Sequence, residues 1–122
     1  MLDHIGIAVT DLVASQAFYE KALKPLGIRL VAGDGAHYAG FGTGEKGFFW
    51  LGPTETPPTR VHVAFASENR DTVHRFYDAA LAAGGTDNGG PGLRPDYHPN
   101  YYGAFVLDPD GHNIEAVCHK AV

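Results

Sequence analysis

The chain has 122 residues, of which 44% are hydrophobic and 19% charged, and its formal net charge is −5. This size and composition predict one globular domain with a buried core. The negative charge and the lack of a basic run argue against nucleic-acid binding. No apolar run reaches the ~18 residues of a membrane span, and no signal-peptide pattern is present. The single cysteine, Cys118, excludes an intrachain disulfide. We therefore expect a cytoplasmic protein.

An internal repeat dominates the sequence. When the chain is shifted by 58 residues, the stretch 4–27 aligns with the stretch 62–85 without a gap, and seven of the 24 aligned positions are identical. The identical pairs are His4/His62, Ala8/Ala66, Phe18/Phe76, Tyr19/Tyr77, Ala22/Ala80, Leu23/Leu81 and Gly27/Gly85. A repeat of this length indicates one supersecondary unit used twice, so the two histidines should be related by a pseudo-twofold axis.

Each repeat is predicted to begin with a strand and a helix. Alternating bulky and small side chains predict strands at 4–9 and 61–66. Helical spacing of apolar residues predicts helices that start after the N-caps Asp11 and Asn69 and cover the bulky strand faces. Three strands follow in each repeat, near residues 29–33, 36–42 and 47–52 in the first and near 86–89, 101–107 and 113–118 in the second.

The predicted fold class is α+β, with two pseudo-symmetric βαβββ repeats whose curved mixed sheets enclose a cavity. One domain is expected over residues 1–122, with repeat one at 1–52, a Pro-rich linker at 53–59 and repeat two at 60–122. His4 and His62 lie on the strand faces that the helices leave open. Their neighbours on those faces are small and cannot fill a core, so these faces are predicted to line the cavity.

A third candidate ligand lies on the last strand. Alternation over 113–118 places Glu115 on the face opposite Ile114, Ala116 and Cys118. If this apolar trio faces the helix, Glu115 points into the same cavity as the two histidines. A carboxylate in an apolar cavity is costly unless it is paired or binds a metal. Two imidazoles and one carboxylate suit Fe(II), Mn(II), Ni(II), Co(II) or Zn(II), so a divalent metal ion is the predicted cofactor.

Two segments carry a resemblance to a known family. The first strand reads DHIGIAV at 3–9, and the last turn and strand read DPDGHNIE at 108–115. With the βαβββ repeat, they resemble the vicinal oxygen chelate superfamily, which includes glyoxalase I, extradiol dioxygenases, fosfomycin-resistance enzymes, methylmalonyl-CoA epimerase and bleomycin-resistance proteins. The resemblance implies that His4, His62 and Glu115 are metal ligands. It also implies a homodimer, with ligands drawn from one chain or from two.

The sequence departs from glyoxalase I at the fourth ligand of that enzyme, a glutamate on the last strand of the first repeat. Aligning 49–51 with 114–116 places Trp50 there, and tryptophan cannot bind a metal. The resemblance therefore implies a glyoxalase-like enzyme with three protein ligands, which binds a small oxygen-bearing substrate through two oxygens. Lyase or isomerase, dioxygenase and thiol transferase chemistry stay open.

Substrate-binding and catalytic candidates come mainly from the loop at 89–100 and its flanks. His98 could serve as a general acid or base, and Tyr101 or Tyr102 could donate a hydrogen bond to a metal-bound oxyanion. Arg94 and Lys46 could hold an anionic group. The aromatic candidates for the pocket wall are Phe48, Trp50, Tyr97 and Tyr101.

The alternative function is a metal-free protein that binds a drug or another small molecule, as the bleomycin-resistance members do. In that case the three ligand residues are retained without use. His112, in the turn before the last strand, is expected at the solvated surface.

Overall fold

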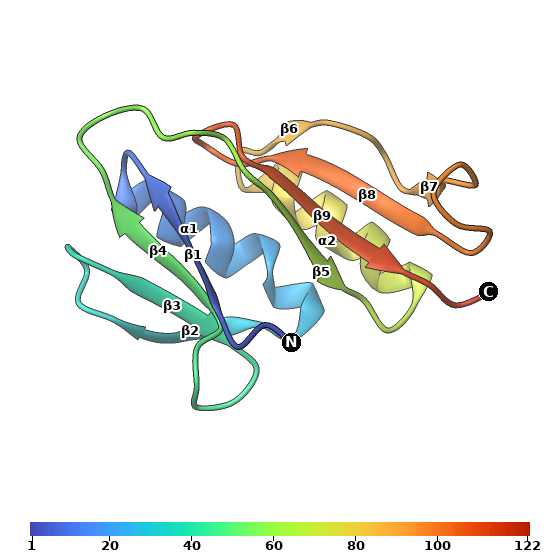
Figure 1. The fold of residues 1–122 in the computed structure, drawn as a ribbon, viewed down its shortest axis with the longest axis horizontal. Coiled ribbons are helices and arrows are strands. Elements are labelled where there is room, and N and C mark those ends of the chain that lie inside the picture. Colours follow the sequence, from blue (N-terminus) through green and yellow to red (C-terminus); the bar gives the residue numbers. More distant parts are fainter.

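The computed structural model describes all residues from 1 to 122 (Figure 1). In chain order the elements are β1 (Ile5–Val9), α1 (Leu12–Ala22), the 3-10 helix η1 (Lys24–Leu26), β2 (Arg29–Gly33), β3 (Ala39–Gly42), β4 (Phe49–Pro53), β5 (His62–Ala66), α2 (Arg70–Ala82), β6 (Thr86–Asp87), β7 (Gly92–Leu93), β8 (Tyr102–Leu107) and β9 (Asn113–Cys118).

Each repeat forms its own mixed sheet. The first has the strand order β1-β4-β3-β2, and the second has the order β5-β9-β8-β6, with β7 also paired to β8. In both sheets the first strand runs parallel to the last strand of its repeat, and the other pairs are antiparallel. The predicted α+β class with two βαβββ repeats is confirmed. The two sheets stay separate, however, and do not close around a cavity.

The second repeat differs from the first at its second strand. The stretch predicted as one strand near 86–89 forms only the two-residue strand β6, and the chain pairs again as β7. Gly89 has a positive φ of 139°, and Pro91 has no backbone N–H to donate to a ladder. Pairing is therefore interrupted between the two short strands.

Both helices pack on the same side of the two sheets. Helix α1 contacts β4, α2 contacts β8 and β9, and the helices contact each other. On β5, Val63 and Phe65 are buried while His62 and Ala64 are exposed, as the alternation predicted. One core of 22 buried residues contains side chains of both repeats. Phe49 of the first repeat and Phe65 of the second meet edge to face, with ring centroids 5.2 Å apart.

The helices begin where the sequence predicted. The Asp11 carboxylate accepts a hydrogen bond from the Ala14 amide at 3.1 Å, and the Asn69 side chain accepts one from the Thr72 amide at 2.8 Å. Each bond satisfies a backbone donor that the first turn of a helix leaves free. Neither helix combines the length and the hydropathy that crossing a membrane would need.

Candidate functional site

A cleft of about 610 Å³ opens between the two repeats along β1 and β5. Ten of its 14 lining residues are hydrophobic, among them Phe48 and Phe65. Both His4 and His62 lie on its wall. An apolar cleft with a few polar groups is the usual form of a small-molecule site.

His62 and Glu115 form a close pair at this site. Ala64 on β5 stands opposite Glu115 on β9, and His62 lies on the same face of β5 as Ala64. The side chains of His62 and Glu115 therefore both extend from the helix-free face of the second sheet. His62 Nε2 lies 3.0 Å from Glu115 Oε1, and the side chains are 49% and 1% exposed. The imidazole is therefore accessible from the cleft, whereas the carboxylate is enclosed.

The contact between His62 and Glu115 is not a hydrogen bond. Glu115 Oε1 is buried and has no hydrogen-bond partner, although it lies within ion-pair distance of Nε2. The other ring nitrogen, Nδ1, donates to the Asn113 carbonyl at 3.0 Å. A neutral His62 therefore turns the lone pair of Nε2 towards the site, beside a carboxylate oxygen. Two such acceptors repel unless a proton or a cation lies between them.

The spacing of these two atoms matches a pair of metal ligands. With metal–ligand bonds of about 2.1 Å, two neighbouring ligands of one metal lie about 3.0–3.4 Å apart. The observed 3.0 Å separation of Nε2 and Oε1 falls in this range. The unpartnered Oε1 and the free lone pair of Nε2 thus fit a divalent metal.

Tyr101 holds the other oxygen of Glu115. Its hydroxyl donates a hydrogen bond to Oε2. Burial, together with this bond, raises the pKa of Tyr101 well above its usual value. The tyrosine therefore remains a neutral donor at physiological pH.

His4 is oriented in a similar way by exposed groups. Its Nδ1 lies 2.7 Å from Asp3 Oδ1, and Asp3 Oδ2 accepts a hydrogen bond from Lys46 Nζ at 2.8 Å. The hydrogen bonds from Lys46 and His4 lower the pKa of Asp3. Donation from Nδ1 to this carboxylate leaves Nε2 of His4 as a free acceptor, the arrangement typical of histidines that bind metals.

A single chain does not bring His4 to the His62–Glu115 pair. The strands β1 and β5 run in opposite directions along the cleft (Figure 1). The His112 ring bridges Val61, next to His62, and Ala8, at the far end of β1 from His4. Four residues of strand separate His4 from Ala8, which corresponds to about 13 Å. The two histidines thus lie at opposite ends of the cleft.

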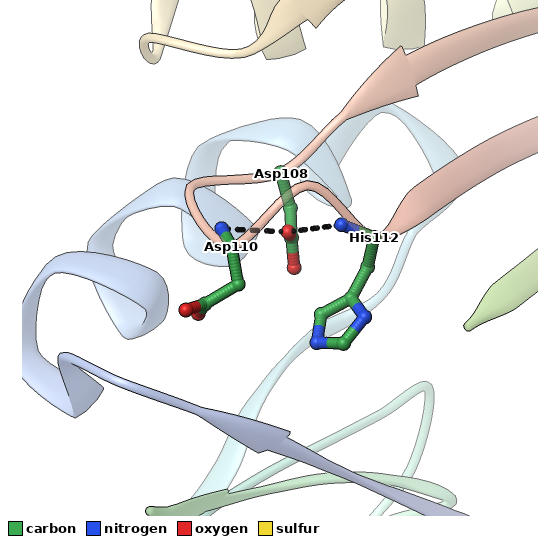
Figure 2. Close-up of side chains that lie close together, drawn as sticks. All are labelled: Asp108, Asp110 and His112. Carbon is green, nitrogen blue, oxygen red and sulfur yellow. Dashed lines mark hydrogen bonds between the residues drawn. The ribbon is translucent and has the colours of Figure 1, made fainter. Parts of the chain in front are cut away.

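A different group of three side chains does come together in one chain. The ligand atoms of Asp108, Asp110 and His112 all lie within 4.8 Å of one another, in the turn between β8 and β9 (Figure 2). Asp108 Oδ1 accepts hydrogen bonds from the amides of Asp110 and His112, at 2.9 and 2.8 Å. Its Oδ2 accepts one from the Tyr19 hydroxyl of α1. By distance alone, this group could hold a metal ion.

The hydrogen bonds of His112 argue for a structural role instead. Its Nε2 donates to the Ala8 carbonyl at 2.9 Å, and its Nδ1 accepts from the Val61 amide at 3.1 Å. Neither nitrogen has a lone pair left for a metal. Asp110 in turn accepts from the Thr10 hydroxyl at 2.6 Å. We call Asp108, Asp110 and His112 the inter-repeat latch, because all three bond to the first repeat.

The expectation that His112 is solvated was wrong. The residue is 1% exposed, since its ring fills the space between β1 and the chain entering β5. Turn composition correctly predicted where the chain reverses but not that a second repeat would cover the turn.

Comparison with known proteins identifies the family. The model of the Glyoxalase/Bleomycin resistance protein/Dioxygenase superfamily matches residues 1–116. The chain belongs to this superfamily. No curated protein matches the chain.

Solved structures of superfamily members share the fold. A glyoxalase/bleomycin resistance protein from Albidiferax ferrireducens T118 is 29% identical, with a TM-score of 0.83 over 98% of this chain and 99% of that one. A glyoxalase-related enzyme from Fulvimarina pelagi is 20% identical, with a TM-score of 0.75 over 97% and 87%. A family enzyme from Burkholderia phytofirmans PsJN is 19% identical, with a TM-score of 0.73 over 96% and 97%. The last two comparisons show the fold alone.

Strand register makes Trp50 the counterpart of Glu115 in the first repeat. Gly6 stands opposite Trp50 and Ala64 stands opposite Glu115, and Gly6 and Ala64 are equivalent in the repeat. The indole lies flat on the first sheet, over Gly40 and Gly47. A Cβ at either glycine would collide with its ring. At this position the first repeat contributes an apolar surface in place of a carboxylate.

The other predicted residues are more dispersed. Phe48 lines the cleft, and Lys46 pairs with Asp3 beside His4. The Tyr102 hydroxyl lies 2.6 Å from His74 Nε2 on α2, so it lies on the helix side of β8, opposite Glu115. The remaining three belong to the loop before β8. Arg94 lies over the Phe105 ring, Tyr97 packs against Tyr101, and His98 packs against His119.

Two supporting roles were not predicted from the sequence. Asp3 precedes a predicted ligand and orients it, and Tyr101 was predicted to bind substrate rather than to support Glu115. A carboxylate next to a candidate histidine is a usable signal for the first. The second depends on a loop conformation that the strand pattern does not specify.

Proposed function

We propose that the protein is a metal-dependent enzyme of the vicinal oxygen chelate type. His62 and Glu115 of one chain, with His4 of a second copy, would hold a divalent metal ion. A substrate with two adjacent oxygens would bind at the remaining coordination positions. The observation that carries this proposal is Glu115 Oε1, a buried carboxylate oxygen without a hydrogen bond, 3.0 Å from a histidine nitrogen that is free to accept.

The chain supports such chemistry through its own groups. A bound divalent metal would act as a Lewis acid that stabilises negative charge developing on the substrate oxygens. In the dimer, the apolar wall of the cleft would limit the access of water, which would strengthen the electrostatic interactions made inside it. With Trp50 at the fourth ligand position, the protein would occupy three coordination positions and leave the others to the substrate.

A second copy of the chain would complete the site. The His4 of the second copy is needed because, within one chain, His4 and the His62–Glu115 pair lie at opposite ends of the cleft. The helix-free strand faces carry small residues, including the exposed Gly6 and Ala64, which would allow a second chain to approach closely. We propose a homodimer with twofold symmetry, which would contain two identical sites.

Metal removal tests the proposal directly. Saturating Ni(II), Co(II), Mn(II) or Zn(II) should stabilise the metal-free protein by about 2.7 kcal/mol at 100 times Kd. For a domain of this length, that corresponds to a rise in melting temperature of about 10 °C. Chelation should reverse the rise, as measured by calorimetry. If none of these metals, nor Fe(II) under anaerobic conditions, raises the melting temperature, the proposed function is wrong.

Mixed copies test whether the site spans two chains. His4→Ala and Glu115→Gln should each abolish metal binding when alone. Refolded together in equal amounts, they should form mixed dimers in half of the cases, each with one intact site. Metal stoichiometry per chain should then recover to about one quarter of the wild-type value. A site within one chain predicts no recovery, so a mixture without bound metal would contradict this arrangement.

Metal-free binding of a planar molecule is the second candidate. The flat placement of Trp50 favours it, with the half-exposed Tyr38 ring centroid 6.3 Å from that of the indole. Such a surface can stack on an aromatic ligand. Tight binding of a planar ligand by protein freed of metal with a chelator would favour this function over the enzyme, provided that added metal does not change the melting temperature.

A further inference from the structure

The two oxygens of Glu115 have different surroundings. Oε2 accepts the Tyr101 hydroxyl, whereas Oε1 faces His62 Nε2 and has no hydrogen bond. A free carboxylate can bind a metal through one oxygen or through both. An oxygen that already accepts a hydrogen bond is a poorer ligand, so the two oxygens are not equivalent towards a cation in the cleft.

The position of Tyr101 is well determined by its neighbours. The loop that carries it is closed by hydrogen bonds from the Arg94 amide to the Tyr101 carbonyl at 2.7 Å and from the Tyr101 amide to the His98 carbonyl at 3.1 Å. The rings of Tyr97 and His119 pack edge to face on its ring, at centroid distances of 5.1 and 5.2 Å. The hydroxyl is thus directed at Glu115 by contacts on several sides.

Gly103 provides the space for this hydrogen bond. A Cβ at this position would come 3.2 Å from both Glu115 Oε2 and Tyr101 Cε1. Both contacts are tighter than a side chain normally makes, so either the carboxylate or the ring would have to move. Glycine here lets Tyr101 reach across the sheet to the carboxylate.

We propose that Tyr101 is a positioning residue that reserves Oε1 as the only oxygen of Glu115 available to a metal. This inference rests on the proposed function. With one oxygen of Glu115 occupied, the protein uses one coordination position fewer than a bidentate glutamate would. The position left open is the one that a substrate with two oxygens requires.

Tyr101→Phe tests the inference, with Co(II) as the probe. Loss of an outer-shell hydrogen bond typically weakens metal binding about 10–100-fold, and that loss is expected here in a direct Co(II) titration. The freed Oε2 should also join the coordination shell, which would weaken the visible absorption of bound Co(II). Tyr77→Phe is a matched control, because the Tyr77 hydroxyl donates to the Asp87 carboxylate at 3.0 Å, on a strand that does not line the cleft.

The possible outcomes are distinct. Wild-type affinity and an unchanged Co(II) spectrum in Tyr101→Phe would overturn the inference while leaving the proposed function intact. Failure of the wild-type protein to bind Co(II) would overturn both. If Tyr101→Phe does not fold, Gly103→Ala provides the same test, since it retains the hydroxyl but crowds Oε2. It should weaken Co(II) binding as well, and unchanged binding would again overturn the inference.

Discussion

Replacing Asp108 by alanine should lower the free energy of unfolding by about 3–5 kcal/mol, because buried donors left without a partner cost about 1–3 kcal/mol each. Asp108 is 5% exposed and accepts from two amides and the Tyr19 hydroxyl. Domains of this kind are stable by about 5–15 kcal/mol in total, so the loss is large. Urea unfolding followed by fluorescence of Trp50, the only tryptophan, measures it.

Asp34→Ala is the matched control for this prediction. The Asp34 carboxylate also accepts hydrogen bonds from two amides, those of Ala36 at 2.9 Å and His37 at 2.7 Å, but in an exposed loop. Water can replace this carboxylate, so the loss of stability should be about 1 kcal/mol or less. Equal losses in the two variants would show that the inter-repeat latch does not hold the repeats together.

The fold was largely predictable because its signals are local. Alternation over 61–66 identified which side chains are buried, and N-cap residues marked both helix starts. The break between β6 and β7 was missed, although Pro91 and its neighbouring glycines carry the signal. Separate sheets could not be foreseen, since closure depends on contacts between repeats.

The site was predictable only in part, for a geometric reason. Alternation indicates the face of a strand from which a side chain extends, and this correctly placed His62 beside Glu115. It does not indicate how the two repeats are oriented about their axis. An axis that reverses β5 relative to β1 puts equivalent residues at opposite ends of the cleft, so His4 lies far from its repeat equivalent.

The inter-repeat latch shows the same limit. Nothing near His112 in the sequence indicates that its ring will accept from Val61 and donate to Ala8, residues that lie 51 and 104 positions away. Charged and polar residues in a turn normally indicate solvent. Here they satisfy the backbone groups where one repeat meets the other, which removes those groups from water at little cost.

Glu115→Gln should separate metal binding from folding more sharply than any other single change. The affinity for divalent metal should fall by more than about 100-fold, since loss of an outer-shell partner alone costs about 10–100-fold. The metal-free protein, in contrast, should be as stable as the wild type or more stable by up to about 1 kcal/mol. An amide at this position can donate to His62 Nε2 and still accept from Tyr101, so it removes the repulsion between two acceptors.

Calorimetry with and without Co(II) measures both effects on the same samples. Glu55→Gln is the control, because it removes one negative charge from an exposed site and should change neither quantity. If the pair is a metal site, Glu115→Gln should retain the stability of the metal-free protein and lose metal binding. A structural ion pair between protonated His62 and Glu115 predicts a loss of stability instead, because neutralising the glutamate would remove the partner of the half-exposed imidazolium. Because the carboxylate lies beside the imidazole without a hydrogen bond to it, we expect the first result.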